Sequence, residues 1–133
     1  MIYLLDVNAL LALGVREHEF HERTAKWVKR TAAPDDISFA TCAITELGFL
    51  RVLLQSAYAG YTVSLGTKLL EHLKSRGLHF QFLIDDQGAA ALPQWVKWPK
   101  QVTDGHLIAL AKAHGAVLAT LDEGIRGAFV IPR

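Results

Sequence analysis

The sequence predicts a three-layer α/β/α fold built on a mostly parallel sheet of about five strands. Short apolar runs alternate along the chain with longer segments in which apolar residues recur at helical spacing. The runs are continuous rather than alternating with polar residues, which indicates strands that are buried on both faces. Strands that alternate with helices in this way are typical of a parallel sheet covered by helices on both sides. In such sheets, ligands bind beyond the carboxyl ends of the strands, near a topological switch point.

The N-terminal half is expected to hold strands and helices in alternation. An apolar run opens the chain, and the polar residues that follow it end the first strand. Asn8 is expected to cap the first helix and Thr41 the third, because both residue types accept hydrogen bonds from helix N-termini. A rough apolar stripe around Trp27 predicts the second helix. In order, these segments are a strand at 2–5, a helix at 9–15, a helix at 19–31, a strand at 37–41 and a helix at 43–55.

The C-terminal half continues the same alternation. Gly77 stands where glycine commonly ends a helix. The best-marked helix follows Thr103 and carries Leu107, Leu110 and Ala111 at i, i+3 and i+4. In order, these segments are a loop at 57–61, a helix at 64–76, a strand at 79–84, an irregular stretch at 85–101, a helix at 104–113, and strands at 116–120 and 128–131.

Length and composition limit the class of protein. The chain has 133 residues and is expected to form a single domain over 1–133, because domains commonly contain about 100–200 residues. Hydrophobic residues make up 51% and charged residues 20%, a mix that excludes a disordered or collagen-like chain. The formal net charge is only +1. Binding to nucleic acid would therefore depend on local patches rather than on a bulk positive field.

Cysteine content and hydropathy indicate the compartment. The single cysteine, Cys42, excludes an internal disulfide and a zinc site built on cysteines. No apolar run approaches the roughly 20 residues that a membrane-spanning helix needs. The start of the chain lacks the basic residues and the long apolar stretch of a signal peptide. We therefore expect a small cytoplasmic globular protein with no membrane partner.

Four acidic residues stand where a carboxylate is unexpected. Asp6 directly follows the first apolar strand, and Asp122 lies two residues beyond the strand at 116–120. Glu46 and Asp104 lie near the starts of two otherwise apolar helices. For each aspartate taken alone, helix capping is the alternative, at roughly 1 kcal/mol each. Glu46 has a weaker alternative, because a carboxylate in an apolar setting costs free energy unless it is paired.

Taken together, the four acids predict a metal site. Strands end and helices begin on the same edge of a parallel sheet, so one edge could gather all four carboxylates. Two such charges about 5 Å apart repel by about 3 kcal/mol at an effective dielectric constant near 20. Protons or divalent cations must therefore neutralise the cluster, and ligation by oxygen alone favours Mg²⁺ or Mn²⁺ over zinc. Because such an ion activates water and stabilises charge on a phosphate, the residues suggest metal-assisted phosphodiester hydrolysis.

Four short motifs resemble those of PIN-domain ribonucleases, in the same order and at similar spacing across essentially the whole chain. They are Leu-Leu-Asp-Val-Asn at 4–8, Thr-Glu-Leu at 45–47, Thr-Asp-Gly-His-Leu-Ile-Ala-Leu-Ala at 103–111 and Leu-Ala-Thr-Leu-Asp at 118–122. Each motif contains one of the four acids. The chain length and the Met-Ile-Tyr-Leu-Leu-Asp start are most similar to the VapC toxins of bacterial VapBC toxin–antitoxin modules.

The resemblance implies a PIN-like α/β fold and an endoribonuclease that depends on Mg²⁺ or Mn²⁺. Its acidic catalytic site would consist of Asp6, Glu46, Asp104 and Asp122. The three aspartates would bind the metal ion, and Glu46 would hold a metal-bound water or a second ion. Asn8 and Thr120 match polar positions that would orient carboxylates or water from a second shell around the ion.

The resemblance also implies partners. These are an RNA substrate, a small VapB-like antitoxin and a second copy of the chain in a homodimer. An antitoxin Arg is expected to enter the acidic cleft, because its planar fork matches carboxylates in two-point contact. The rest of the antitoxin segment is expected to cover a groove between the helices at 9–15 and 43–55. Two alternatives remain: a housekeeping PIN nuclease without an antitoxin, and a catalytically inactive PIN-like RNA-binding module.

The segment at 94–100 interleaves two indoles with two cations. Trp95, Lys97, Trp98 and Lys100 could face RNA, where rings stack on bases and cations hold phosphates. Alternatively, both Trp rings could close the core under an irregular segment. His106, two residues after Asp104, is expected to pack or to form a hydrogen bond.

Overall fold

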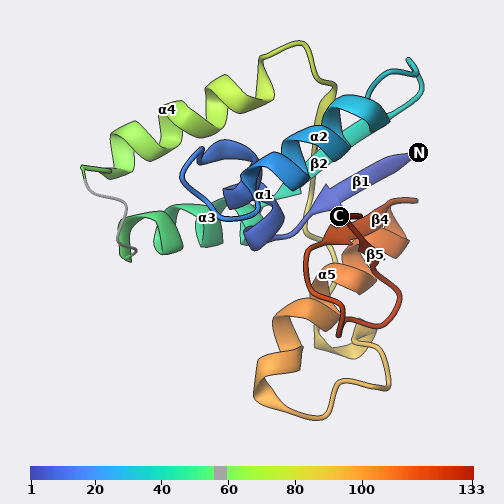
Figure 1. Ribbon diagram of the computed structural model, residues 1–133. Coiled ribbons are helices and arrows are strands. Elements are labelled where there is room, and N and C mark those ends of the chain that lie inside the picture. The colour runs from blue at the N-terminus through green and yellow to red at the C-terminus, as the bar shows by residue number, and fades with distance from the viewer. Residues whose placement is uncertain (56–59) are drawn as a thin grey trace.

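The computed structural model describes residues 1–55 and 60–133 and has one five-stranded sheet with the strand order β3-β2-β1-β4-β5 (Figure 1). All four strand pairings are parallel. The strands are β1 (Ile2–Leu5), β2 (Ser38–Cys42), β3 (Phe80–Leu83), β4 (Val117–Thr120) and β5 (Phe129–Val130). The helices are α1 (Val7–Gly14), α2 (His21–Thr31), α3 (Ala43–Gln55), α4 (Val63–Lys74) and α5 (Val102–Ala113), with 3₁₀ turns η1 (Ala89–Ala91) and η2 (Pro99–Gln101).

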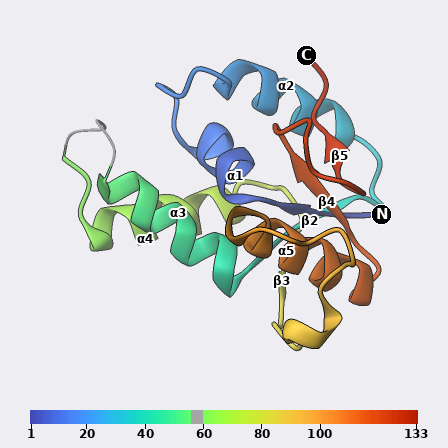
Figure 2. The same ribbon diagram turned by 90° about the horizontal axis from the view of Figure 1, so that it is seen from below.

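Helices cover both faces of the sheet, which confirms the predicted three-layer arrangement. Figure 2 shows α1 and α2 on one side of the sheet and α5 on the other. The first face carries Leu5 and Phe39, which pack with α1, α2, α3 and α4 in one core. The second face carries Leu4 and Ala40, which pack with α5 in a separate core. Because successive strand residues point to opposite faces, strands between two cores are largely apolar, and the buried polar residues Thr41 and Thr120 lie near the carboxyl ends of β2 and β4.

The strand order places a topological switch point between β1 and β4. From β1 the chain moves outward to β2 and then β3, and α5 then carries it back across to β4 on the other side of β1. Connections that leave in opposite directions open a crevice beyond the carboxyl ends of the two strands. β1 ends immediately before Asp6, and β4 ends two residues before Asp122.

The predicted elements are present, but several boundaries and caps differ. Asp6, and not Asn8, is the N-cap of α1, because the helix begins directly after the strand and the Asp6 carboxylate accepts the Ala9 N–H. Thr41 directs its hydroxyl to Glu46 instead of capping α3. Helix α5 begins at Val102, so Asp104 lies inside its first turn. The loop predicted at 57–61 falls largely outside the described residues. Among the described residues, no helix is long and apolar enough to span a bilayer.

Helix α3 packs directly on the start of α1, and this contact fixes the segment that follows Asp6. A Cβ atom added at Gly48 would lie 2.5 Å from Cγ2 of Val7. Real Cβ atoms do not approach so closely, so only glycine fits at this point. The helices at 9–15 and 43–55, between which we expected a groove, thus belong to elements that are in direct contact at Gly48 and Val7.

We predict that Gly48→Ala lowers the free energy of unfolding. Alanine has the higher helix propensity, by about 1 kcal/mol. The branched Val7 side chain cannot swing away, however, and overpacking of this kind costs about 1–3 kcal/mol. Urea unfolding measures the net change. In a Val7→Ala background the clash is absent, and the same substitution should be neutral or stabilising. An equal effect of Gly48→Ala in both backgrounds would contradict the packing argument.

Candidate active site

Asp6 is a buried carboxylate at the switch point, with a relative exposure of 7%. Its Oδ1 accepts a hydrogen bond from the Ala9 N–H at 2.8 Å. Its Oδ2 accepts a hydrogen bond from the hydroxyl of Thr120, which is completely buried at the end of β4. The side chain therefore links the end of β1, the start of α1 and the end of β4.

The environment raises the pKa of Asp6 from 3.8 to about 6. Burial is the largest cause, because it removes the charged form from water. The negative charges of Asp104 and Asp122 raise the pKa further, whereas the hydrogen bonds from Thr120 and Ala9 lower it. Asp6 is thus a carboxylate whose full charge at neutral pH has a free-energy cost, and a nearby cation would remove that cost.

Asp104 and Asp122 lie close enough to act on the charge of Asp6 and on each other. Burial raises the pKa of the partly buried Asp104, and the charge of Asp122 raises it further. Asp122 is exposed, and its backbone N–H donates to the Thr120 hydroxyl at 3.0 Å. A single Thr120 hydroxyl thus donates to Asp6 and accepts from Asp122. The structure therefore brings together three of the four acids that the sequence predicts.

The three aspartates fit a divalent cation in their chemistry, since they are oxygen ligands whose charges repel one another. Within residues 1–55 and 60–133, no group of three or more His, Cys, Asp or Glu side chains stands in a metal-binding arrangement. Binding would require the more exposed Asp104 and Asp122 side chains to turn toward the fixed Asp6.

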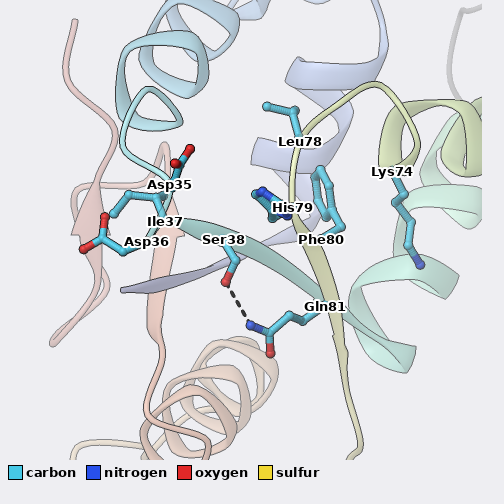
Figure 3. A pocket seen from close by; sticks show the side chains of 9 residues that line it. All are labelled: Asp35, Asp36, Ile37, Ser38, Lys74, Leu78, His79, Phe80 and Gln81. Atoms are coloured by element: carbon cyan, nitrogen blue, oxygen red, sulfur yellow. Dashed lines mark hydrogen bonds between the residues drawn. The ribbon is translucent and has the colours of Figure 1, made fainter.

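Glu46 belongs to a separate group of side chains. Its Oε2 accepts a hydrogen bond from the Thr41 hydroxyl and pairs with the Lys74 ammonium at 2.7 Å. The Lys74 Nζ also lies 5.6 Å from the centre of the Phe82 ring. Figure 3 shows the Lys74 side chain directed past β3 toward α3, the helix that carries Glu46. Lys74 supplies the pairing that a carboxylate in an apolar helix needs, and the sequence did not reveal it.

The hollow drawn in Figure 3 lies at the opposite end of the sheet from the aspartates. It is lined by the residues that enter β2 and β3, among them Asp35, Asp36 and His79. Ser38 and Gln81, also in its wall, bond to each other at 2.9 Å. Because ligands of parallel sheets bind at the carboxyl ends of the strands, this hollow is not the candidate active site.

Asn8 lies near one of the three aspartates, Asp122. It is exposed and lines the same cleft as Asp122, together with Glu17 and Glu19. His106 forms a hydrogen bond to Asp85 at 2.8 Å, which confirms the hydrogen-bonding role expected for it. His114 binds the adjacent Asp86 at 3.0 Å, so two His–Asp pairs join the segment after β3 to α5.

The segment at 94–100 divides between the two roles that the sequence left open. Trp95 is half-buried and packs against the core under α5, whereas Trp98 is 65% exposed. Lys97 and Lys100 are both exposed. One indole therefore closes the core, and the other indole and both cations face solvent.

We predict that Asp6→Asn stabilises the metal-free protein above about pH 6. Asp6 titrates at 3.8 in the unfolded chain and near 6 when folded, so the folded state holds the extra proton between these values. Stability contributed by that proton is lost as the pH rises through this window. The shift corresponds to about 3 kcal/mol at most, and the difference between variant and wild type should vanish below pH 3.8.

Urea unfolding of metal-free protein from about pH 3 to about pH 8, with EDTA present, measures this difference. Asp35→Asn, which changes an exposed acid at the other end of the sheet, is the matched control and should show no such pH dependence. If the Asp6→Asn variant were less stable than wild type at pH 8, the charged Asp6 carboxylate would not destabilise the fold, and the argument would be contradicted.

Comparisons with known proteins identify the family. The PIN domain family model matches residues 3–128. Ribonuclease VapC38 of Mycobacterium tuberculosis is 36% identical over 126 residues, which are 92% of this chain and 86% of that protein. Ribonucleases VapC29 and VapC44 of the same organism are 34% and 36% identical over 126 residues each, which cover 94% and 92% of this chain and 89% and 87% of those proteins.

A solved structure supports the fold. The crystal structure of PAE2754 from Pyrobaculum aerophilum matches with a TM-score of 0.57 at 20% identity, over 96% of this chain and 82% of that one. The four motifs, the five-stranded parallel sheet and these matches agree with one another. The chain therefore belongs to the PIN-domain family, and it is similar to the members of that family named ribonuclease VapC.

Proposed function

We propose that this chain is a metal-dependent endoribonuclease and the toxin of a cytoplasmic toxin–antitoxin pair. The observation that carries the proposal is the buried Asp6 at the switch point, with the charges of Asp104 and Asp122 acting on it. A hydrolase that needs a divalent cation requires such a crowded set of oxygen ligands. The names of the relatives, all ribonucleases, support RNA as the substrate.

Asp6, Asp104 and Asp122 would hold the Mg²⁺ or Mn²⁺ ion. When bound, the ion supplies a water of lowered pKa and stabilises negative charge on the scissile phosphate. Thr120 keeps Asp6 oriented, because its hydroxyl donates to Oδ2 of that carboxylate. The same hydroxyl fixes the backbone at Asp122. The Asp6 carboxylate and the Asp122 backbone are thereby held at two neighbouring strand ends before substrate binds.

Glu46 would orient the attacking water. Thr41 and Lys74 both bind its Oε2, so the proposal assigns the water to the other oxygen, Oε1. The ion pair with Lys74 holds this carboxylate in place. Asn8, which lines the cleft with Asp122, would position water or phosphate from the rim.

We predict that Asp6→Asn and Asp104→Asn each reduce RNA cleavage by more than about 100-fold, because loss of a ligand exceeds the 10–100-fold effect of losing an outer partner. Thr120→Val should reduce cleavage by about 10–100-fold, because it removes the hydroxyl that orients the ligand Asp6. The measurement is incubation of the purified chain with total RNA, with and without Mg²⁺ or Mn²⁺, followed by mapping of the cleavage ends.

Asp35→Asn is again the matched control and should cleave at the wild-type rate, since Asp35 lies at the other end of the sheet. Cleavage that persists in EDTA, or in the Asp6→Asn protein, would refute the metal role. A wild-type chain that leaves all RNA intact with either ion would refute the proposed activity.

The antitoxin would block the acids and also occupy an apolar hollow elsewhere. An antitoxin Arg would pair with the aspartates. The hollow lies between α1, α2 and α4, with Leu13, Leu69 and Leu73 in its lining. Its cations are Arg16, Lys29 and Arg76, together with two histidines. Because no described lining residue is acidic, the occupant would be an amphipathic segment with acidic side chains.

The homodimer would use exposed apolar side chains near the sheet edge. Leu47 on α3 is 62% exposed, and Phe82 and Ile84 at the edge strand β3 are 48% and 67% exposed. Such side chains on an edge strand favour association with a second copy. The active-site cleft lies at the switch point, on the other side of β2, and would stay accessible.

We predict that Arg76→Glu weakens the complex with the small protein encoded next to this gene by about tenfold or more, because a reversed charge repels an acidic segment. Arg51→Glu, on the exposed side of α3, should leave the affinity unchanged. Light scattering on mixtures gives both the affinity and the mass of the chain alone, which should be that of a dimer. Equal binding by the two variants would contradict the placement of the antitoxin in this hollow.

A further inference from the structure

Two adjoining clefts lie beside the aspartates, on the side of the sheet covered by α5. The first cleft, of about 320 Å³, is lined by Trp95, Lys97, Gln101, Gly124 and Arg126. The second, of about 540 Å³, shares Trp95 and Arg126 with the first and continues along α5 past Lys112. The two shared residues make the clefts parts of one groove.

Two residues that line the first cleft lie close to aspartates of the site. Gly124 lies two residues after Asp122, and its N–H donates to the Asp122 carboxylate at 2.7 Å. Gln101 lies immediately before α5, whose first turn carries Asp104. An extended polymer bound in the cleft would therefore pass next to the acidic site.

The charge of the groove is one-sided although the whole chain is nearly neutral. The lining contributes the cations Lys97, Lys112 and Arg126. None of the described residues that line either cleft is acidic. The whole chain has a net charge of only +1, so these cations form a local positive patch next to the three carboxylates. Such a patch favours a polyanionic ligand, one of whose phosphates would then lie at the aspartates.

The wall of the first cleft is held rigidly. The backbone N–H groups of Lys97 and Trp98 both donate to Oε1 of Gln101, at 2.8 and 3.1 Å. A Cβ atom at Gly105 would lie 2.3 Å from Val96, so the segment is pressed onto α5 where only glycine fits. Trp95 is half-buried and packs against the core, so its ring presents a fixed apolar surface to the cleft.

We propose that the first cleft binds one unstacked nucleotide of single-stranded RNA next to the scissile phosphate. The base packs on Trp95, and Lys97 and Arg126 hold its phosphate. This inference rests on the proposed ribonuclease function. An aromatic wall with cations at its rim is the chemistry that binds single-stranded nucleic acid, and a base can reach such a wall only when it is free of a duplex.

The test uses the full chain with Asp6→Asn in EDTA, so that binding is measured without cleavage. The probe is a fluorescein-labelled, unstructured RNA decamer of mixed sequence. Arg126→Gln should weaken binding and lower the slope of log affinity against log salt by about 0.7, as expected for the loss of one phosphate contact on a single strand. Trp95→Leu should weaken binding about fivefold or more.

Arg30→Gln is the matched control, since Arg30 is an exposed arginine on α2, across the sheet. Tryptophan fluorescence gives a second readout that does not depend on overall stability. With Trp98→Phe added, Trp95 and the buried Trp27 on α2 remain, and RNA should quench only the Trp95 emission. Adding Trp95→Phe should therefore abolish the quenching. Equal effects of Arg126→Gln and Arg30→Gln, quenching that survives Trp95→Phe, or equally tight binding of a duplex would each overturn the inference. Cleavage by the chain with native Asp6 separately tests the ribonuclease function.

Discussion

The hydrogen bond from Thr120 to the buried carboxylate of Asp6 is the interaction on which the site depends. A carboxylate inside a protein is stable only when donors or cations replace its water. Here the donors come from β4 and from the first turn of α1, so the ends of two adjacent strands cannot separate without leaving the charge unpaired. The donors do not offset burial in full, because the pKa of Asp6 stays raised to about 6.

The same constraint connects the fold to the proposed chemistry. A parallel sheet with the order β3-β2-β1-β4-β5 must reverse its winding direction beside β1, and the reversal opens the crevice in which Asp6 lies. Val7, the residue directly after Asp6, is fixed by close packing against Gly48 of α3. Asp104 and Asp122 approach from α5 and from the end of β4, and their charges add to the cost that a cation would remove. A site that accepts an ion is thereby built from one fixed, buried carboxylate and two more exposed ones beside it.

Much of this could be predicted from the sequence, because buried parallel strands leave continuous apolar runs and Asp6 stands directly after the first of them. The cap of α1 was predicted wrongly at Asn8, since Asp and Asn cap equally well and only the abrupt turn from strand to helix selects Asp6. Lys74 was missed because a lysine on α4 looks like any solvent-facing cation until folding places it on Glu46, 28 residues away. Arg126 and Trp95 lie outside the regular helices and strands, in segments whose paths carry no periodic signal, so their meeting with Gln101 in one cleft could not be predicted.

The most direct test is titration of the Asp6 carboxyl carbon by NMR in the metal-free protein, with Asp6→Asn to assign the signal. The account predicts a midpoint near pH 6, which moves down when Asp104→Asn or Asp122→Asn removes a neighbouring charge and moves down further when Mg²⁺ is added. A midpoint near 3.8 that responds to neither the neighbouring substitutions nor the ion would contradict it.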